Sequence, residues 1–207
     1  MRIIKGDPCV AEGAAWLAAR EPRFAEALDQ VGPLPLRLKP EGFLELLSAI
    51  MGQQVSIASA AAINGRLREA GLVDERSVDA ASEAELRACG LSRQKIRYAH
   101  ALARSGIDFN ALRGMDSAEV VRTLTRVPGI GTWTAEIYAM FSLGHADIFA
   151  SGDLALQEAA RLLFDLPDRP KEKDMRRMAL AWSPWQSVAA RILWAYYRIA
   201  KDREGIA

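Results

Sequence analysis

Apolar residues recur along this chain at spacings of three and four, the period of an amphipathic helix, whereas strand-like alternation is scarce. One such stripe runs through residues 41–51 and predicts a buried helix there. The clearest stripes are these groups: Phe43, Leu47 and Ile50; Ile63 and Leu67; Ile96, Ala99 and Ala103; Val120, Leu124 and Val127. The pattern therefore predicts an all-α fold.

Helix ends are marked by residues that cap the first turn or break the last one. Candidate N-caps precede predicted helices at Asp7, Ser82, Ser92, Asp116, Asp153 and Ser183. Three of them, Ser82, Asp116 and Ser183, have glutamate or glutamine three residues later, which predicts a capping box. Asp7 and Ser183 are followed by a proline suited to the first helical turn. The helix after Asp116 should continue as far as Pro128.

A proline-rich stretch separates the first helices from the rest of the chain. Residues 32–40 contain three prolines, too many for a helix, and should run as an extended connector. Short helices are predicted before it, over 10–19 and 23–30. We therefore expect residues 1–40 to form an N-terminal helical segment and connector that packs on the C-terminal helices, and residues 41–207 to form the main domain.

Composition allows an ordinary globular protein of one or two small domains, since the chain has 207 residues and half of them are apolar. Cys9 and Cys89 have neither metal-ligand nor disulfide spacing, which excludes a zinc or iron–sulfur site built on cysteines. The first residues lack the apolar run of a signal peptide, and no segment has the length of a membrane span. We expect a cytoplasmic protein without a membrane partner.

The net charge of +1 gives no support for nucleic-acid binding, for which a strongly basic balance is usual. A local basic group near the C-terminal helices consists of Lys171, Lys173, Arg176 and Arg177. A solvated helix face explains this group better than a binding surface does. Any case for DNA must therefore come from local motifs.

The most informative local motif is a two-glycine turn between two predicted helices. Residues 124–135 contain a helix end, the turn Pro-Gly-Ile-Gly and the start of an apolar helix, and together they resemble a helix-hairpin-helix motif. Gly129 and Gly131 allow backbone angles that other residues resist, and their bare backbones let a phosphate come close. The first N–H groups of the next helix, aided by its dipole, then point at the anion. This binding needs no lysine.

The alternative for this turn is a plain tight connection between packed helices, which is the usual explanation of an isolated two-glycine turn. Ile130 favours the binding motif, because a turn that faces solvent would normally carry a polar residue between its glycines. An apolar residue there suits a small core that holds the two hairpin helices together.

A second motif is the loop 147–157, which contains an aspartate at a predicted helix start. The simplest role of Asp153 is to cap that helix, and loss of such a cap costs about 1 kcal/mol. A catalytic role is the alternative. The two roles are compatible, because a cap position fixes the direction of the carboxylate.

Four segments carry these and related motifs: Gly-Gln-Gln-Val-Ser at 52–56, Val-Pro-Gly-Ile-Gly-Thr-Trp-Thr-Ala at 127–135, the loop 147–157, and Trp-Ser-Pro-Trp-Gln-Ser-Val-Ala-Ala-Arg-Ile-Leu-Trp at 182–194. In order and spacing they resemble the 3-methyladenine DNA glycosylase II family of helix-hairpin-helix DNA glycosylases, over about 41–198. The resemblance implies two helical lobes with the active-site cleft between them and a hairpin at about 117–142. It also implies a short form without the family's full N-terminal sheet domain.

By this resemblance Asp153 is the catalytic residue. Cleavage of an N-glycosidic bond builds positive charge on the sugar, and a nearby carboxylate stabilises it. Asp153 would also orient or deprotonate the attacking water, and an alkylated purine, already cationic, leaves without strong acid help. Asp147 is expected to be secondary.

The residue after the hairpin sets the reaction type. Bifunctional relatives have a lysine where this chain has Trp133, and that lysine attacks the sugar and leads to strand cleavage. Tryptophan cannot form a Schiff base. The resemblance therefore implies hydrolysis by water, an abasic-site product and no lyase step.

The resemblance also assigns residues to base and DNA binding. The base pocket would be formed by Trp133, Trp194, Gln53 and Ile137, where stacking and cation–π attraction favour a cationic alkylated ring. The phosphate would be bound at Gly129, Gly131, Thr132 and Thr134. Gln54 would be the wedge that fills the gap left by a flipped base, with a helix-end cap as its alternative role. Trp182 and Trp185 are assigned to the core, Trp185 on the helix face opposite Trp194.

Two residues depart from the family pattern. Ala150 stands where proline is usual, and Gln186 stands where arginine is usual. Both leave the carboxylate in place and bear on damage preference. His100 and His145 have no partner arrangement in the sequence, so we expect surface or core roles for them.

The expected partner is double-stranded DNA that contains damaged bases, bound by a nucleoid-associated monomer in base excision repair. No cofactor and no metal is expected, although the hairpin would accept a monovalent cation. Three alternatives stay open: a glycosylase for an oxidised, deaminated or mispaired base; a non-enzymatic helix-hairpin-helix module that holds DNA; and a helical scaffold with no DNA role.

Overall fold

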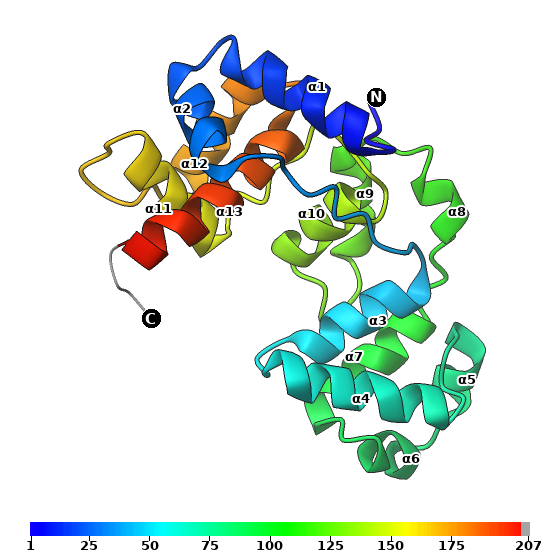
Figure 1. The fold of residues 1–207 in the computed structure, drawn as a ribbon. Helices are drawn as coiled ribbons and strands as arrows, with labels where there is room; N and C mark the ends of the chain where they lie inside the picture. Colours follow the sequence, from blue (N-terminus) through cyan, green and yellow to red (C-terminus); the bar gives the residue numbers. More distant parts are fainter. Residues whose placement is uncertain (204–207) are drawn as a thin grey trace. The chain divides into compact units, whose positions relative to one another are not determined.

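The computed structural model describes residues 1–203, whose regular structure is helical throughout (Figure 1). The elements, in chain order, are α1 Asp7–Ala18, α2 Pro22–Val31, α3 Phe43–Gly52, α4 Ile57–Glu69, α5 Glu75–Ala80, α6 Glu83–Ala88, α7 Arg93–Ala103, α8 Phe109–Leu112, α9 Ser117–Leu124, α10 Thr132–Phe141, α11 Leu154–Leu163, α12 Glu172–Ala179, the 3-10 turn η1 Leu180–Trp182 and α13 Gln186–Arg203. Strand-like pairing within residues 1–203 is limited to an isolated bridge between Ile3 and His145. The all-α prediction is confirmed.

The chain divides into two compact units, one formed by residues 1–38 and the chain from 139 onward, the other by residues 39–138. The sequence predicts one domain over residues 41–207, with residues 1–40 packed on its C-terminal helices. The structure instead returns to the first unit at residue 139, inside α10. No proline or glycine interrupts the helix at that point, so the pattern of the sequence does not mark this boundary.

Helix α13 is the centre of the first unit. Helices α1, α2 and α11 pack against it, and Figure 1 shows the blue N-terminal helices beside the orange-to-red α13. Gly13 of α1 permits the close approach, because a Cβ there would lie 2.7 Å from both Trp185 and Val188. An aromatic cluster, with ring centroids 5.2 to 6.0 Å apart, is formed by Phe24, Phe149, Phe164 and Trp182.

Helices α3, α4 and α7 form the centre of the second unit, and the short helices α5 and α6 pack on α7. The apolar stripes that predicted these helices face its core. Their buried members include Phe43, Leu47, Ile50, Ile63, Leu67, Ile96 and Ala99. The burial of these side chains is the driving force that holds the short helices together.

Most of the predicted helix caps are present. The side chains of Ser82, Ser92, Asp116 and Asp153 each accept a hydrogen bond from the first turn of the helix that follows. The capping boxes at Ser82 and Asp116 are complete. These interactions span only three residues, which is why the sequence alone predicts them.

Two predicted caps are wrong. The N-cap of α1 is Gly6, and Asp7 lies inside the first turn, where its negative charge suits the helix dipole. Ser183 follows the 3-10 turn and does not start a helix, since α13 begins at Gln186. The Ser183 hydroxyl donates instead to Oδ2 of Asp147, at 2.8 Å.

The helix after Asp116 ends earlier than predicted. Helix α9 stops at Leu124, where the Thr125 hydroxyl bonds back to the carbonyl of Val121, at 2.7 Å. Val127 is still buried, but as a turn residue. Val127 is buried because it is apolar, and not because it belongs to the face of a helix.

Candidate functional site

Asp153 lies where a buried loop meets helix α11. The side chain is half-buried, and Ile148, Phe149, Ala150 and Ser151 before it are buried. Oδ1 of Asp153 accepts hydrogen bonds from the backbone N–H groups of Ala155, at 2.9 Å, and Leu156, at 3.0 Å. Asp153 therefore caps α11, and the positive end of the helix dipole favours a negative charge there.

A tryptophan of α13 donates to the same carboxylate. Nε1 of Trp194 lies 3.3 Å from Oδ1 of Asp153. The half-buried Trp194 ring packs on Phe141, with 5.7 Å between ring centroids and 32° between ring planes. The first unit thus brings together two of the predicted site residues, the carboxylate and one wall of the expected base pocket. An aromatic ring beside an anion is a suitable surface for a flat, cationic base.

Two side-chain contacts hold the loop that carries Asp153. The Gln157 amide donates to the carbonyl of the buried Ser151, at 2.8 Å. At the start of the loop, Asp147 accepts the hydrogen bond from Ser183. Asp147 therefore anchors the start of the loop.

The two-glycine turn lies between α9 and α10 in the second unit. Gly129 has φ of +95°, a backbone region that favours glycine, and a Cβ there would lie 2.4 Å from Cγ of Tyr98. The Gln53 amide donates to the Gly129 carbonyl, at 2.9 Å. Ile130 is buried, as expected of a residue that pins the hairpin core. Gly129 is therefore fixed both by its conformation and by its neighbours.

Gly131 does not need the backbone freedom predicted for it. Its φ lies outside the left-handed region, and a Cβ there would meet no atom within 4 Å. The carbonyl of Gly131 accepts the N–H of Ala135, at 3.0 Å, which begins α10. Gly131 therefore leaves space beside its backbone, as predicted, but its backbone angles do not require a glycine.

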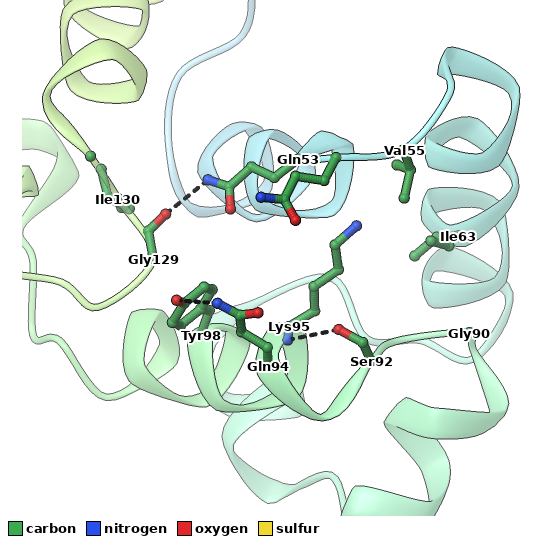
Figure 2. Close-up of a pocket in the computed structure, with 12 residues that line it drawn as sticks. Gln53, Val55, Ile63, Gly90, Ser92, Gln94, Lys95, Tyr98, Gly129 and Ile130 are labelled. Atoms are coloured by element: carbon green, nitrogen blue, oxygen red, sulfur yellow. Dashed lines mark hydrogen bonds between the residues drawn. The ribbon is translucent and has the colours of Figure 1, made fainter.

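A polar cavity of about 600 Å³ lies beside this turn, within the second unit (Figure 2). Its walls include Gln53, Gln54, Lys95, Tyr98 and the hairpin residues 129–131. Lys95 donates from Nζ to the carbonyl of Met51, at 2.6 Å, and burial lowers the pKa of its ammonium group. The cavity therefore combines amide groups and one cation with exposed hairpin backbone.

The first turn of α10 carries the other residues predicted to bind DNA. Thr132 is exposed and Trp133 is 47% exposed, whereas Thr134 is buried. The first-turn N–H groups of a helix have no partner within the helix and carry its positive dipole end. The contact expected of Thr134 would therefore use its backbone N–H. Ile137, further along α10, is half-buried.

Gln54, the predicted wedge, lies on an exposed turn after α3. Its φ is +56°, which is uncommon for a residue other than glycine. Val55 and Ile57 beside it are exposed, Ile57 to 91%. The C-cap of α3 is Gln53, so the helix-end role considered for Gln54 falls to its neighbour.

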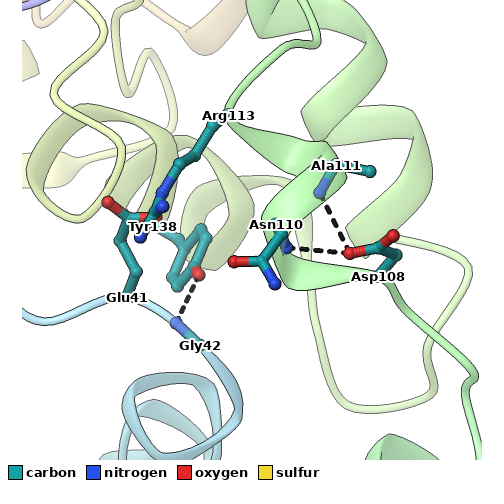
Figure 3. Close-up of polar contacts among 7 residues, drawn as sticks. All are labelled: Glu41, Gly42, Asp108, Asn110, Ala111, Arg113 and Tyr138. Atoms are coloured by element: carbon teal, nitrogen blue, oxygen red, sulfur yellow. Dashed lines mark hydrogen bonds and ion pairs between the residues drawn. The ribbon is translucent and has the colours of Figure 1, made fainter.

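Tyr138 ties α10 to the start of α3 within the second unit (Figure 3). Its hydroxyl accepts the N–H of Gly42, at 2.7 Å, and Glu41 next to it pairs with Arg113, at 2.6 Å. Burial, together with the nearby charges of Glu41 and Glu45, raises the pKa of Tyr138. This hydrogen bond holds α10 in its second half, away from the hairpin turn.

The remaining aromatic and basic predictions are resolved by burial and pairing. Trp182 and Trp185 are buried in the core of the first unit. Trp185 precedes α13, so it does not share a helix with Trp194 as the sequence suggested. On α12, Arg176 pairs with Glu172 and Arg177 with Asp174, as on a solvated helix face.

The two histidines take the roles expected of them. His145 is fully buried in the first unit. His100 lies with Nε2 3.1 Å from the carbonyl of Ala81.

Phe141 and Lys95 are site residues that the sequence did not indicate. Phe141 lies at the last position of α10, and its contact with Trp194 is tertiary. Lys95 follows the predicted cap Ser92, and its bond to Met51 is equally non-local. Neither residue has a local signal in the sequence, because both contacts join segments that are distant along the chain.

Within residues 1–203, no group of three or more histidine, cysteine, aspartate and glutamate side chains is placed to hold a metal ion. Cys9 and Cys89 are both free. In the same described range, no helix combines the length and the apolar character needed to cross a membrane.

A family model described as HhH-GPD superfamily base excision DNA repair protein matches residues 47–186, more than half of the chain. A similar sequence is the alkylbase DNA glycosidase-like protein mag2 of Schizosaccharomyces pombe. It is 25% identical over 190 residues, which cover 86% of this chain and 89% of the relative.

Two solved structures are also similar. A DNA-3-methyladenine glycosidase from Bacillus halodurans has 32% identity and a TM-score of 0.84, over 98% of this chain and 95% of that one. The 3-methyladenine DNA glycosylase Mag1 of Schizosaccharomyces pombe, solved in complex with abasic DNA, has 26% identity and a TM-score of 0.76. That match covers 88% of this chain and 95% of the Mag1 chain.

Proposed function

This chain belongs to the HhH-GPD superfamily of base excision DNA repair proteins, and we propose that it is a monofunctional DNA glycosylase for alkylated purines of the 3-methyladenine type. Its substrate is double-stranded DNA and its product an abasic site. Relatives named for alkylated bases and for 3-methyladenine support this specificity. The observation that carries the proposal is the Asp153 carboxylate, which caps α11 and accepts the indole N–H of Trp194.

The chemistry follows from what one fixed carboxylate does. As the N-glycosidic bond breaks, positive charge builds on the sugar, and the anion at Asp153 stabilises it. The same group orients the attacking water or accepts its proton. An alkylated purine is already cationic and departs as a neutral base, so no general acid is needed. Hydrogen bonds to Oδ1 from α11 and Trp194 fix the direction of the carboxylate.

The alkylated base must leave the DNA stack to be cut. The ring of Trp194 offers a flipped base a stacking face, and stacking on an electron-rich indole favours a cationic ring over a neutral one. This preference supports alkylated purines over oxidised or deaminated bases as the substrate class.

DNA contact is assigned to the hairpin of the second unit. The open backbone at Gly131 and the first turn of α10 suit a phosphate oxygen. Gln54, on its exposed turn, is assigned to the gap that the flipped base leaves. Such backbone binding agrees with a net charge of only +1, because it needs few lysines or arginines.

Because Trp133 stands where a lysine would be needed for strand cleavage, we assign to this protein hydrolysis without a lyase step. An indole carries no amine, so no covalent intermediate with the sugar forms at this position. The reaction needs no cofactor, and we assign it to a monomer. A monovalent cation at the hairpin would assist phosphate binding without entering the chemistry.

The test is base release from duplexes that each contain one lesion, followed by alkaline cleavage of abasic sites. We expect release of 3-methyladenine-type bases by the wild-type protein and release at least about 100-fold slower by Asp153→Asn. Without alkali the strand should remain intact, and borohydride should trap no covalent complex.

Each other outcome identifies a different function. Release of an oxidised or mispaired base instead would overturn the proposed substrate class, while the protein would still be a DNA glycosylase. Equal activity of Asp153→Asn and the wild type would overturn the catalytic role of Asp153. Salt-dependent duplex binding without release of any base would identify a non-enzymatic DNA-binding module.

A further inference from the structure

A buried cation on α13 has no part in the chemistry above. Arg191 is 1% exposed. Within residues 1–203 its hydrogen-bond partners are oxygens of carbonyl and hydroxyl groups rather than carboxylates: Leu36 O, at 3.0 Å from Nη2, and Ser187 O and Oγ, at 2.9 and 2.5 Å from Nη1. Burial, with a contribution from Arg37, lowers the pKa of Arg191 to about 10. Keeping a charge in this position is costly, so an apolar residue would serve a purely structural role better.

Arg191 lies at one end of a row of side chains that leads to the carboxylate. Its guanidinium carbon is 4.7 Å from the centroid of the Phe141 ring. The Phe141 ring packs on Trp194, and Trp194 donates to Asp153. Arg191 and Trp194 are three residues apart on α13, a spacing that places both on the same face of the helix.

We propose that Arg191 is a positioning residue for the reaction: through Phe141 it holds the Trp194 ring in the orientation that donates to Asp153. This inference rests on the proposed catalytic role of Asp153. The four hydrogen bonds of the guanidinium, two of them to Leu36, fix its plane. A cation held over an aromatic face attracts that ring and limits its rotation. Phe141 then presents a fixed surface to the indole.

A competing explanation gives Arg191 a structural role alone. Its bonds to the Leu36 carbonyl attach the connector to α13, and this attachment would stabilise the first unit whatever happens at Trp194. The two explanations differ in what Trp194 experiences. A structural anchor affects the free energy of unfolding, whereas a positioning residue also changes the Trp194 indole and the rate of base release per folded molecule.

The experiment compares Arg191→Met with Arg191→Lys, and uses Ile192→Val as a matched control on the same helix. Ile192 is fully buried and belongs to no part of the site. Arg191→Met should lower the single-turnover rate of base release roughly 10- to 100-fold, the scale of a misplaced catalytic group, and leave binding of abasic DNA within about twofold. Arg191→Lys should recover part of the rate, since it keeps the charge but lacks the planar face.

A second readout does not depend on activity. In ¹H–¹⁵N spectra of the indole N–H groups, the Trp194 signal is identified by its loss in Trp194→Phe. We expect this signal to shift in Asp153→Asn and in Arg191→Met, and to keep its wild-type position in Ile192→Val. If the wild-type protein releases no base, the proposed function fails, and this spectrum still tests whether Arg191 orients the indole.

Coupling between the two residues completes the test. If Arg191 acts through Trp194, the two rate losses should not multiply. The rate of base release by the double variant Arg191→Met/Trp194→Phe should then lie within about twofold of the rate of the slower single variant. The proposal would be overturned if the rate losses of the two single variants multiply in the double variant. It would also be overturned if Arg191→Met is less stable but keeps the wild-type rate and the wild-type Trp194 signal. Should Arg191→Met fail to fold, Phe141→Leu keeps the guanidinium hydrogen bonds and breaks the row, with the same expectations and the same overturning results.

Discussion

The two units build their candidate site residues from different parts of the polypeptide. In the first unit the site consists of side chains, with Trp194 and two backbone N–H groups directed at the Asp153 carboxylate. In the second unit the site is the backbone itself, a turn at Gly129 with φ of +95°, whose carbonyl is held by Gln53. The first site is defined by a functional group and the second by a shape.

This difference predicts which changes each unit tolerates. A site made of side chains should lose its chemistry when one oxygen becomes a nitrogen, even though the fold is unaffected. A site made of backbone should tolerate changes of nearby functional groups and fail when a methyl group is added. Defects in the first unit should therefore appear in the rate of base release, and defects in the second in stability and DNA binding.

The largest effect is expected for Asp153→Asn. Asparagine caps helices about as well as aspartate, so the fold should remain, while the rate of base release should fall roughly 100- to 1,000-fold through loss of the negative charge. The measurement is single-turnover release at saturating DNA. Asp108→Asn is the matched control, because Asp108 accepts the same two kinds of backbone N–H bonds, at 2.9 and 3.0 Å (Figure 3). A comparable rate loss in both variants would mean that the loss is a general effect of replacing a helix-capping aspartate, and not the loss of a catalytic charge at Asp153.

The next effect tests the backbone site. Gly129→Ala places a methyl group 2.4 Å from Cγ of Tyr98 at a φ that alanine resists. Together, strain and overpacking should lower the free energy of unfolding by roughly 2–4 kcal/mol, which urea titration measures. DNA binding should weaken as well, while the release rate of DNA-saturated, folded protein stays within about threefold of wild type. A rate loss as large as that of Asp153→Asn would erase the distinction between the two units.

A smaller effect is expected for Trp194→Phe, which keeps the ring and removes the N–H. The carboxylate loses one charge-assisted hydrogen bond, so release should slow roughly tenfold, with unfolding free energy changed by less than about 1 kcal/mol. Single-turnover kinetics and urea titration measure the two quantities. Trp182→Phe, in the aromatic cluster of the core, is the control: it should lower stability and leave the rate as it is. If Trp194→Phe instead lowers stability and leaves the rate of base release unchanged, Trp194 contributes through packing and not through its hydrogen bond to Asp153.

The same contrast explains how much the sequence predicts. Caps at Ser82, Asp116 and Asp153 depend on hydrogen bonds across two or three residues, so their sequence signal is local and the prediction is correct. The buried Ile130 and the turn at Gly129 are also local features. The position of Asp153 at the end of its loop follows from the same kind of signal.

Features that depend on tertiary contacts are the ones the sequence misses. Ser183 has the local pattern of a cap, but a carboxylate distant in sequence, Asp147, takes its hydroxyl. Phe141 and Arg191 reach the site only through tertiary contacts of the last residue of α10 with α13. Family resemblance supplied Trp194 as a pocket residue, and its bond to Asp153 is visible only in three dimensions.

The smallest effect on folding is expected for Gly131→Ala, which tests the open side of the hairpin. A methyl group at this position meets no atom within 4 Å, and Gly131 lies outside the left-handed region, so no strain is introduced. Alanine also restricts the unfolded chain, which should leave the unfolding free energy unchanged or raise it by a few tenths of a kcal/mol, about 0.5 at most. Gly131 lines the cavity beside the hairpin turn, where we expect a phosphate oxygen to approach the backbone. Loss of one such contact should weaken duplex binding roughly fivefold, as measured by fluorescence anisotropy at fixed salt. Unchanged binding would mean that the phosphate does not contact the backbone at Gly131. A loss of stability would mean that the fold itself requires this glycine.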